Sequence, residues 1–322
     1  MSAKEIIDFL GDDWARVNEL LRGALSTDVK LLDDTNLAVL SHSGKMLRPM
    51  ICLLLSRAMG GGNEDSLKYA AAIELLHNAT LMHDDVADES PQRRGTPTVS
   101  ALLGPSAAVL VGDFWLARAV EMVLDTAHYS KVVKYFSSCL TDLAQGELLQ
   151  MEKASSADTQ EDDYFRIISC KTATLFKVAG ASAARSVDAC EPLFQAAVSY
   201  ATSLGLAFQI KDDILDYDGT STLGKPTGVD LKEKKITLPL LGALKNCSDE
   251  SRYRSMLLEV DSKPENISIL HNFVIANGGL EYAKSRLEEH IDNAVSALDA
   301  FEDSTAKRYL ADIARFNSFR QL

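Results

Sequence analysis

Hydrophobic residues recur at helical spacing along almost the whole chain, and no segment shows the strict alternation of a half-buried strand. The N-terminal segment illustrates the pattern, with apolar side chains on one helical face at Ile6, Phe9, Leu10, Trp14, Val17, Leu20 and Leu21. Prolines fall mostly between such segments, where they end or begin helices. The pattern predicts an all-α protein.

Nothing in the sequence divides the chain. It has no long linker, no low-complexity tract and no short-period repeat. Two long helices are expected, from about residue 65 to 88 and from about residue 193 to 217. We therefore predict that residues 1–322 form a single domain, a large helical bundle around a central cavity.

Two Asp-Asp-x-x-Asp motifs, at residues 84–88 and 212–216, lie at the C-terminal ends of these two helices. Positions i and i+4 share a helical face and i+1 flanks it, so each motif directs three carboxylates toward one place. Such like charges destabilise a helix by roughly 0.2–0.5 kcal/mol per pair, and the negative end of the helix dipole adds to the repulsion. A cation would relieve both effects, and Mg²⁺ binds one or two carboxylates together with substrate phosphates.

Each motif alone is equally consistent with solvated surface charge. The chain offers a comparison, because three other Asp pairs have no acid at i+4 and are interpreted as surface acids: Asp12-Asp13, Asp33-Asp34 and Asp162-Asp163. Two complete motifs at corresponding helix ends favour a site in which facing carboxylates hold a diphosphate through bridging metals.

Basic residues near the motifs are candidate anion contacts. Lys45 and Arg48 are spaced i,i+3 near a helix start, where Arg can bond a phosphate bidentately and Lys acts as a point charge. Two solvated surface cations are the alternative. His77 precedes the first motif by two helical turns, where a structural histidine is the alternative. Weaker candidates are Arg93, Arg94, Lys171 with Thr172, and Lys225 between Gly224 and Pro226.

Composition excludes some classes of function. A net charge of −13 without a basic stripe argues against nucleic acid as a partner. Five cysteines without C-x-x-C spacing are typical of reduced thiols in a cytoplasmic protein. The acidic N-terminal segment does not resemble a signal peptide, and no run of 18 or more apolar residues predicts a membrane span.

The assembled motifs resemble those of the trans-isoprenyl diphosphate synthases, the polyprenyl synthetase family, over about residues 31–244. Within the family, residues 83–90 look most like the long-chain synthases that build quinone tails. The segments that carry the resemblance are Gly44-Lys45-x-x-Arg48-Pro49, His77 with His83-Asp84-Asp85-x-x-Asp88, Arg93-Arg94-Gly95, Val111-Gly112-Asp113, Lys171-Thr172-Ala173, Phe208-Gln209-x-x-Asp212-Asp213-x-x-Asp216, and Gly224-Lys225-Pro226-x-Gly228-x-Asp230.

The resemblance implies the isoprenoid synthase type I fold, a homodimer, and a prenyltransferase that joins isopentenyl diphosphate to an allylic diphosphate. It implies that about three Mg²⁺ ions are held by Asp84, Asp88 and Asp212, supported by Asp85 and Asp216, with Asp213 completing the second motif. The implied allylic diphosphate contacts are Arg93, Lys171 and Lys225, and those of isopentenyl diphosphate are Lys45, Arg48, His77 and Arg94. Thr172 and Gln209 would direct dipoles at the developing carbocation.

Lys235 is expected to assist near the metal cluster. The family usually has glycine before this lysine, whereas this chain has Lys234. Both lysines are therefore candidates for the role.

Product length should depend on the helix that leads into the first motif, since each turn advances about 5.4 Å along the cavity. Short-chain members of the family carry an aromatic residue five or four positions before the motif, where this chain has Ala79 and Thr80. Leu76 lies one turn deeper. A long-chain product is expected, with farnesyl diphosphate as primer, and a core alanine at position 79 is the alternative interpretation.

Other functions compete with this one. A shorter product, geranylgeranyl or farnesyl diphosphate, stays within the same family. A terpene cyclase shares the first motif but usually carries Asn/Asp-x-x-Ser/Thr-x-x-x-Glu as its second. A non-catalytic partner subunit typically loses Asp residues from one motif, and this chain keeps both. Transient membrane contact would help to release a long apolar product, although no amphipathic anchor is evident.

Overall fold

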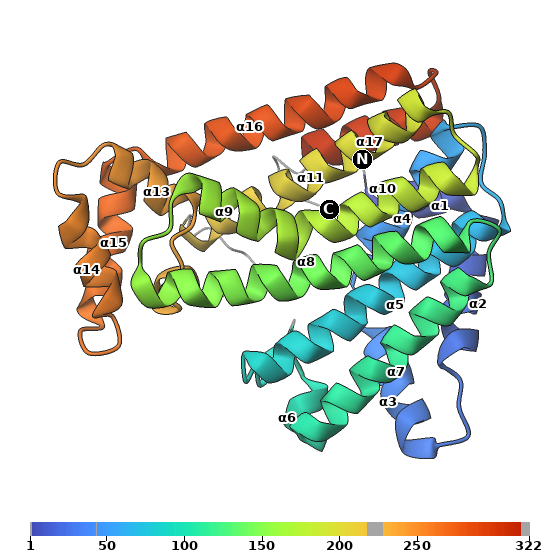
Figure 1. The fold of residues 1–322 in the computed structure, drawn as a ribbon, viewed down its shortest axis with the longest axis horizontal. Helices are drawn as coiled ribbons and strands as arrows, with labels where there is room; N and C mark the ends of the chain where they lie inside the picture. Colours follow the sequence, from blue (N-terminus) through green and yellow to red (C-terminus); the bar gives the residue numbers. More distant parts are fainter. Residues whose placement is uncertain (1, 43, 94, 218–227, 317–322) are drawn as a thin grey trace.

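The computed structural model describes residues 2–42, 44–93, 95–217 and 228–316, which are almost entirely helical (Figure 1). The all-α prediction is confirmed. The helices of the first half are α1 (Ala3–Leu10), α2 (Asp12–Leu25), α3 (Lys30–Ser41), α4 (Leu47–Ala58), α5 (Glu64–Ala87), α6 (Val99–Leu103), α7 (Pro105–Leu124) and α8 (Tyr129–Ser156).

The second half continues with α9 (Glu161–Ile168), a π-helical turn η1 (Ser169–Ala173), α10 (Thr174–Ser186) and α11 (Glu191–Tyr217). It ends with α12 (Val229–Lys232), α13 (Leu238–Lys245), α14 (Glu250–Leu258), α15 (Glu265–Ala276), α16 (Gly279–Ala297), a 3₁₀ turn η2 (Leu298–Ala300) and α17 (Thr305–Phe316).

The two long helices that carry the Asp motifs form as expected. Asn63 and Ser66 make a reciprocal capping box that begins α5, which ends at Ala87, whereas α11 ends at Tyr217. Apolar residues occur on all sides of α5 and most of them are buried, so this helix runs through the core. Both motifs therefore lie at C-terminal helix ends.

Two hydrophobic clusters make up the core, and α11 contributes to both. Its first half packs with α4, α5 and α10, and its second half packs with α13, α15 and α16. Glycines set the close approach of α10 and α11: a Cβ on Gly180 would lie 2.5 Å from the carbonyl oxygen of Ala197, and one on Gly205 would lie 2.7 Å from the Cα of Ala173. Figure 1 shows α8, α10, α11 and α16 running in similar directions across the molecule.

Two very short strands, β1 (Gln92–Arg93) and β2 (Thr96–Pro97), pair antiparallel just after the first motif. The expectation of no strand missed this pair, because two residues per strand are too few to show alternation. Gly95, in the connection, has φ of +79°, a left-handed conformation that glycine adopts without strain.

By length and composition, α11 is able to cross a membrane. It is instead packed between α10 and α16 and bears the second Asp motif, which is the behaviour of a core helix. The sequence prediction had placed no spanning helix here.

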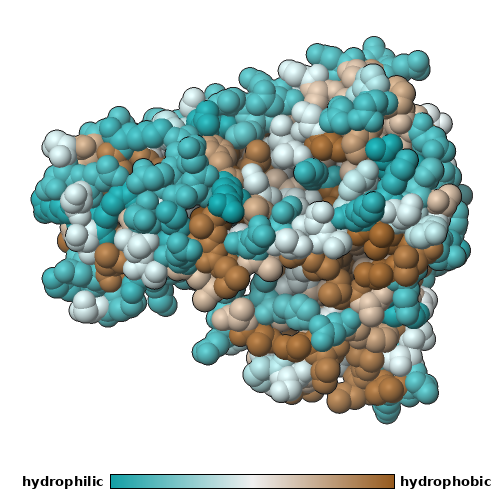
Figure 2. Space-filling model, viewed as in Figure 1, coloured by the Kyte–Doolittle hydropathy of each residue, from teal (hydrophilic) through white to brown (hydrophobic). Residues whose placement is uncertain are grey.

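Large apolar side chains remain exposed on three successive helices. Figure 2 shows apolar surface gathered at the lower right, where Figure 1 places α6 and α7. The exposed residues on α6, α7 and α8 are Leu102, Leu103, Val109, Leu110, Leu124, Tyr129, Leu148 and Met151.

Candidate active site

The three carboxylates of the first Asp motif lie in different environments. Asp85 is buried and accepts a hydrogen bond from Arg93 Nε at 2.8 Å, whereas Asp84 and Asp88 are exposed. Asp85 therefore anchors Arg93 beside the motif. Burial raises the pKa of Asp85, and the adjacent Arg93 charge lowers it in part. Two carboxylates of the motif are left facing outward.

Asp84 is exposed, yet desolvation by the surrounding protein is the largest influence on its pKa. This desolvation raises the pKa of Asp84 to about 6, while the positive charge of Lys171 acts in the opposite direction. Glu147 and Asp88 add negative charge nearby and raise the pKa further. A cation bound beside Asp84 would relieve the repulsion among these carboxylates, as predicted from the sequence.

The second motif shows a similar division. Asp213 is buried, and its carboxylate accepts hydrogen bonds from the Tyr164 hydroxyl at 2.6 Å and from Gln209 Nε2 at 2.8 Å. Burial raises the pKa of Asp213 despite these donors. The Asp216 carboxylate accepts hydrogen bonds from the backbone N–H groups of Val229 and Asp230 at 3.1 and 3.0 Å, so it caps the start of α12.

The positive charge of Lys235 lies near acids of both motifs. Burial alone would lower the pKa of Lys235, but its hydrogen bond to Glu233 and the negative charges of Asp230 and Asp88 outweigh burial, and the net pKa is raised. Lys235 also lowers the pKa of the buried Asp213. The Lys235 ammonium is thus near enough to Asp88 of the first motif and to Asp213 of the second for their charges to influence one another, which indicates that the two motifs lie near each other.

Lys234 lies away from this site. Its φ is +58°, in the left-handed region that favours glycine, and its ammonium is 2.5 Å from Asp261. The backbone therefore adopts here the conformation for which the family's glycine is suited. Of the two lysines that the sequence left as candidates, Lys235 has carboxylates of both motifs near it, and its role in the site stays a prediction.

The π-helical turn η1 presents Lys171 and Thr172. The backbone N–H of Thr174 donates to the carbonyl of Ser169, five residues earlier, which defines the wider turn. Lys171 pairs with Glu147, and the Thr172 hydroxyl donates to Gln209 Oε1 at 2.6 Å. The sequence predicted helix here but not the π geometry.

Gly146 on α8 makes room for this turn. A Cβ at Gly146 would lie 2.7 Å from the Cβ of Cys170 and 3.0 Å from the Cγ of Lys171. Real Cβ atoms do not approach that closely, so the side chain of Lys171 depends on a glycine across from it.

The structure also brings together two of the residues expected to bind isopentenyl diphosphate. Arg48 Nη1 lies 3.1 Å from His77 Nε2, and the Arg48 guanidinium stacks on the Phe176 ring with its carbon 4.5 Å from the centroid. This stacking orients the guanidinium. Lys45 is exposed nearby in the chain, just before α4.

The expected cavity floor lies inside the core. Leu76 and Ala79 are buried, and Thr80 is half-buried with its hydroxyl donating to the carbonyl of His77 at 2.9 Å. Among the described residues, hollows of about 270 and 230 Å³ lie beside α9 and between α2 and α3. Both are away from this floor, so its role in product length stays a prediction.

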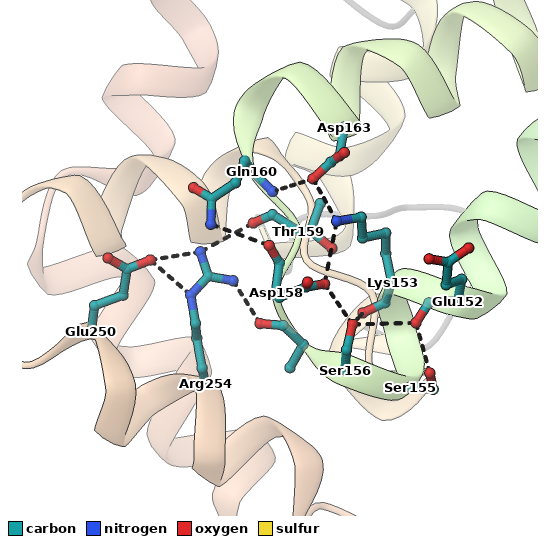
Figure 3. Close-up of polar contacts among 11 residues, drawn as sticks. Glu152, Lys153, Ser155, Ser156, Asp158, Thr159, Gln160, Asp163, Glu250 and Arg254 are labelled. Atoms are coloured by element: carbon teal, nitrogen blue, oxygen red, sulfur yellow. Dashed lines mark hydrogen bonds and ion pairs between the residues drawn. The ribbon is translucent and has the colours of Figure 1, made fainter.

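The loop between α8 and α9 fixes the helix that leads into η1 (Figure 3). Arg254 donates to the carbonyl oxygens of Ala157 and Thr159 at 2.6 and 3.1 Å. Lys153 reaches Asp158 at 3.4 Å and Asp163 at 3.0 Å. These contacts hold the first turn of α9 and, through it, the position of Lys171.

Two predicted contacts, Arg94 and Lys225, lie outside the described residues. Sequence reasoning also missed some neighbours of the site: Glu147, Tyr164, Glu233 and Asp230. No local signal distinguishes Glu147, Tyr164 or Glu233 from other surface-type or core positions in helices. Asp230 was noticed only within a motif, yet burial among Asp213 and Asp216 raises its pKa well above the ordinary value.

The donor set fits Mg²⁺ bound together with substrate. Within residues 2–316, apart from position 43, position 94 and residues 218–227, no three His, Cys, Asp or Glu side chains are grouped closely enough to hold a metal. Mg²⁺ is usually bound through one or two carboxylates, with phosphate oxygens and waters completing its octahedron. The exposed carboxylates of Asp84 and Asp88 suit that arrangement.

The all-helical fold and the two Asp motifs at helix C-termini together indicate a class, the helical enzymes that act on diphosphate substrates. The chain matches the polyprenyl synthetase family over residues 29–274 and belongs to that family. It is a prenyltransferase with the isoprenoid synthase fold.

Individual relatives agree with this assignment. An all-trans-nonaprenyl-diphosphate synthase (geranyl-diphosphate specific) of Rhodobacter capsulatus is 39% identical, over 97% of this chain and 96% of the relative. An octaprenyl diphosphate synthase of Haemophilus influenzae is 36% identical, over 98% and 96%. A crystal structure of a Caulobacter crescentus polyprenyl synthase, complexed with calcium and isoprenyl diphosphate, has a TM-score of 0.90 at 32% identity, covering 100% of this chain and 98% of that one.

Proposed function

We propose that this chain adds isopentenyl diphosphate head-to-tail to an allylic diphosphate, in a Mg²⁺-dependent reaction that gives an all-trans long-chain polyprenyl diphosphate. The observation that carries the proposal is the pair of Asp motifs at the C-terminal ends of α5 and α11, with the charge of Lys235 near Asp88 of one motif and Asp213 of the other. The space between two such clusters suits a diphosphate and its cations.

The proposed roles follow the environments of the side chains. Bound Mg²⁺, about three ions, would supply charge neutralisation at the leaving diphosphate. Asp84, Asp88 and Asp212 would hold it, with Asp85 and Asp216 in support. Lys171 and Arg93 would contact the allylic diphosphate, together with Lys225. Arg48 and His77 would hold isopentenyl diphosphate, together with Lys45 and Arg94.

The chemistry then needs a shielded cation. Heterolysis of the allylic C–O bond leaves an allylic cation and diphosphate, and the isopentenyl double bond attacks the cation. A proton is lost to the departing diphosphate, giving a chain one isoprene unit longer. Thr172 and Gln209, which are joined by a hydrogen bond, would direct oxygen dipoles at the cation, and apolar walls would exclude water.

Chain length is proposed to depend on Ala79, Thr80 and Leu76. None of these carries an aromatic ring, and the two long-chain relatives described above have similar sequences over their whole length. We propose a product beyond geranylgeranyl diphosphate, made from a farnesyl primer, for a menaquinone or ubiquinone side chain.

We also propose a cytoplasmic homodimer. The exposed apolar residues on α6, α7 and α8 offer a surface that a second copy would cover. Transient contact with a membrane would then receive the apolar product.

The test is incubation of the purified chain with Mg²⁺, labelled isopentenyl diphosphate and farnesyl diphosphate. The dephosphorylated products are separated by length, and EDTA provides the control. We expect a Mg²⁺-dependent ladder of long products. Absence of elongation with farnesyl, geranyl and geranylgeranyl primers would instead indicate a cyclase or a non-catalytic subunit.

A further inference from the structure

Four side chains, of Tyr164, Asp213, Gln209 and Thr172, form one continuous hydrogen-bonded series that includes the buried carboxylate of the second Asp motif. The Tyr164 hydroxyl donates to Asp213 Oδ2 at 2.6 Å, and Gln209 Nε2 donates to Asp213 Oδ1 at 2.8 Å. The Thr172 hydroxyl then donates to Gln209 Oε1 at 2.6 Å. Tyr164 has no role in the function proposed above.

The direction of this series is determined by its inner end. Asp213 accepts on both oxygens, so the amide of Gln209 must turn its NH₂ group inward and its oxygen toward Thr172. Thr172 has one hydroxyl proton, and that proton is used on Gln209. The lone pairs of the Thr172 oxygen are what remains for the substrate.

The opposite orientation of the Gln209 amide would destabilise the allylic cation. With the amide reversed, Gln209 would donate to the Thr172 oxygen and occupy a lone pair, and the Thr172 proton would turn elsewhere. A hydroxyl proton directed at a developing allylic cation repels it, whereas a lone pair attracts it.

We propose that Tyr164 is a positioning residue for condensation: through Asp213 and Gln209, it keeps the Thr172 proton on Gln209 and so directs the lone pairs of the Thr172 oxygen at the allylic cation. This inference rests on the proposed function. Tyr164 and Asp213 are only 3% and 4% exposed, so water does not readily replace the Tyr164 hydroxyl if it is lost. The neighbouring Phe165 ring packs edge-on at 5.3 Å and fixes the Tyr164 ring.

The π-helical turn helps to align the series. Tyr164 and Thr172 are eight residues apart, and a regular helix would place them about 80° apart around its axis, at roughly 100° per residue. The i→i+5 turn at Ser169–Ala173 rotates the chain less per residue, which reduces this offset. Both side chains therefore reach the same helix, α11.

The first variant is Tyr164→Phe, with Tyr200→Phe as the matched control. Tyr200 is equally buried, and its hydroxyl donates to the carbonyl of Leu310 at 2.8 Å, away from this series. We expect Tyr164→Phe to lower kcat about tenfold or more, with KM for both substrates changed less than about threefold. Tyr200→Phe should keep kcat within about twofold of wild type.

A double-mutant cycle separates positioning from general loosening. If Tyr164 acts through Thr172, Tyr164→Phe has no further effect on kcat in a Thr172→Val background, whereas Thr172→Ser keeps the dependence. Equal activity of Tyr164→Phe and wild type, or independent effects in the cycle, would overturn the inference alone. An inactive wild type would overturn the proposed function and this inference with it.

Discussion

At the scale of single residues, charge and backbone geometry assign different tasks to neighbouring side chains. Lys234 and Lys235 are adjacent, yet the first is turned toward Asp261 by a left-handed φ and the second interacts with both Asp motifs. The sequence shows two adjacent lysines where the family has a glycine and a lysine. Only the backbone conformation in the structure shows that the two lysine side chains point to different carboxylates.

We expect the two lysines to respond differently to substitution. Lys234→Gly removes left-handed strain of about 1–2 kcal/mol, but glycine loses more backbone entropy on folding, about 0.5–1 kcal/mol. Stability and activity should therefore change little. Lys235→Ala leaves buried carboxylates without their cation, and kcat/KM should fall at least about tenfold, which corresponds to 1.4 kcal/mol. Steady-state kinetics and thermal melts compare them, and equal losses of activity would contradict the assignment.

Ala79 gives a second prediction at this scale. Ala79→Tyr places a ring in the expected path of the growing chain and should shorten the product, and Ala79→Leu should shorten it less. Product length is measured by chromatography after dephosphorylation, with circular dichroism to verify folding. Product lengths identical to wild type in a folded Ala79→Tyr variant would show that the floor lies elsewhere.

At the scale of elements, the start of α9 is tied to distant helices. Glu161 pairs with Lys245 of α13, accepts from the Tyr282 hydroxyl of α16 at 2.7 Å, and lies 3.3 Å from Arg286. Burial alone would raise the pKa of Glu161, but these donors and charges outweigh it, and the net pKa is lowered. The carboxylate thus stabilises the folded state only while it is ionised.

Replacement of Glu161 should have a pH-dependent effect. A lowered folded-state pKa stabilises above the unfolded value of about 4.3, and the stabilisation is lost as pH falls through the folded value. Glu161→Gln should lower the unfolding free energy by about 1–3 kcal/mol at pH 7, and the difference should shrink at lower pH. Denaturant titrations measure it. Glu259→Gln, in an exposed pair with Lys263, is the control, and a pH-independent loss would contradict the ionic explanation.

At the scale of elements, the sequence predicted the long helices but not the local irregularities between them. Apolar periodicity located α5 and α11 to within two residues at each end, and it placed both motifs at helix C-termini. It did not reveal the π turn at Ser169–Ala173, because that turn depends on the packing of α8 and α11 against it rather than on local propensity. The division of each motif into buried and outward carboxylates depends on the same tertiary contacts.

At the scale of the whole molecule, the exposed apolar surface on α6, α7 and α8 predicts self-association. Leu110→Lys combined with Leu148→Lys introduces two charges on this surface, and we expect the dimer to dissociate into monomers. Light scattering after size exclusion measures the mass. Ile275→Lys on α15 is the control, since that side chain is exposed elsewhere. A dimer that survives the double substitution would place the interface on another surface.

The negative C-terminal ends of α5 and α11 affect how fast a diphosphate substrate can bind. The C-termini of α5 and α11 both carry acidic motifs, in a protein whose net charge is −13. A bare diphosphate therefore diffuses against an unfavourable potential, and its rate of association should rise as salt screens that potential. A diphosphate already complexed with cations meets no such barrier, so we expect the free metal concentration to affect how fast the enzyme captures its allylic substrate.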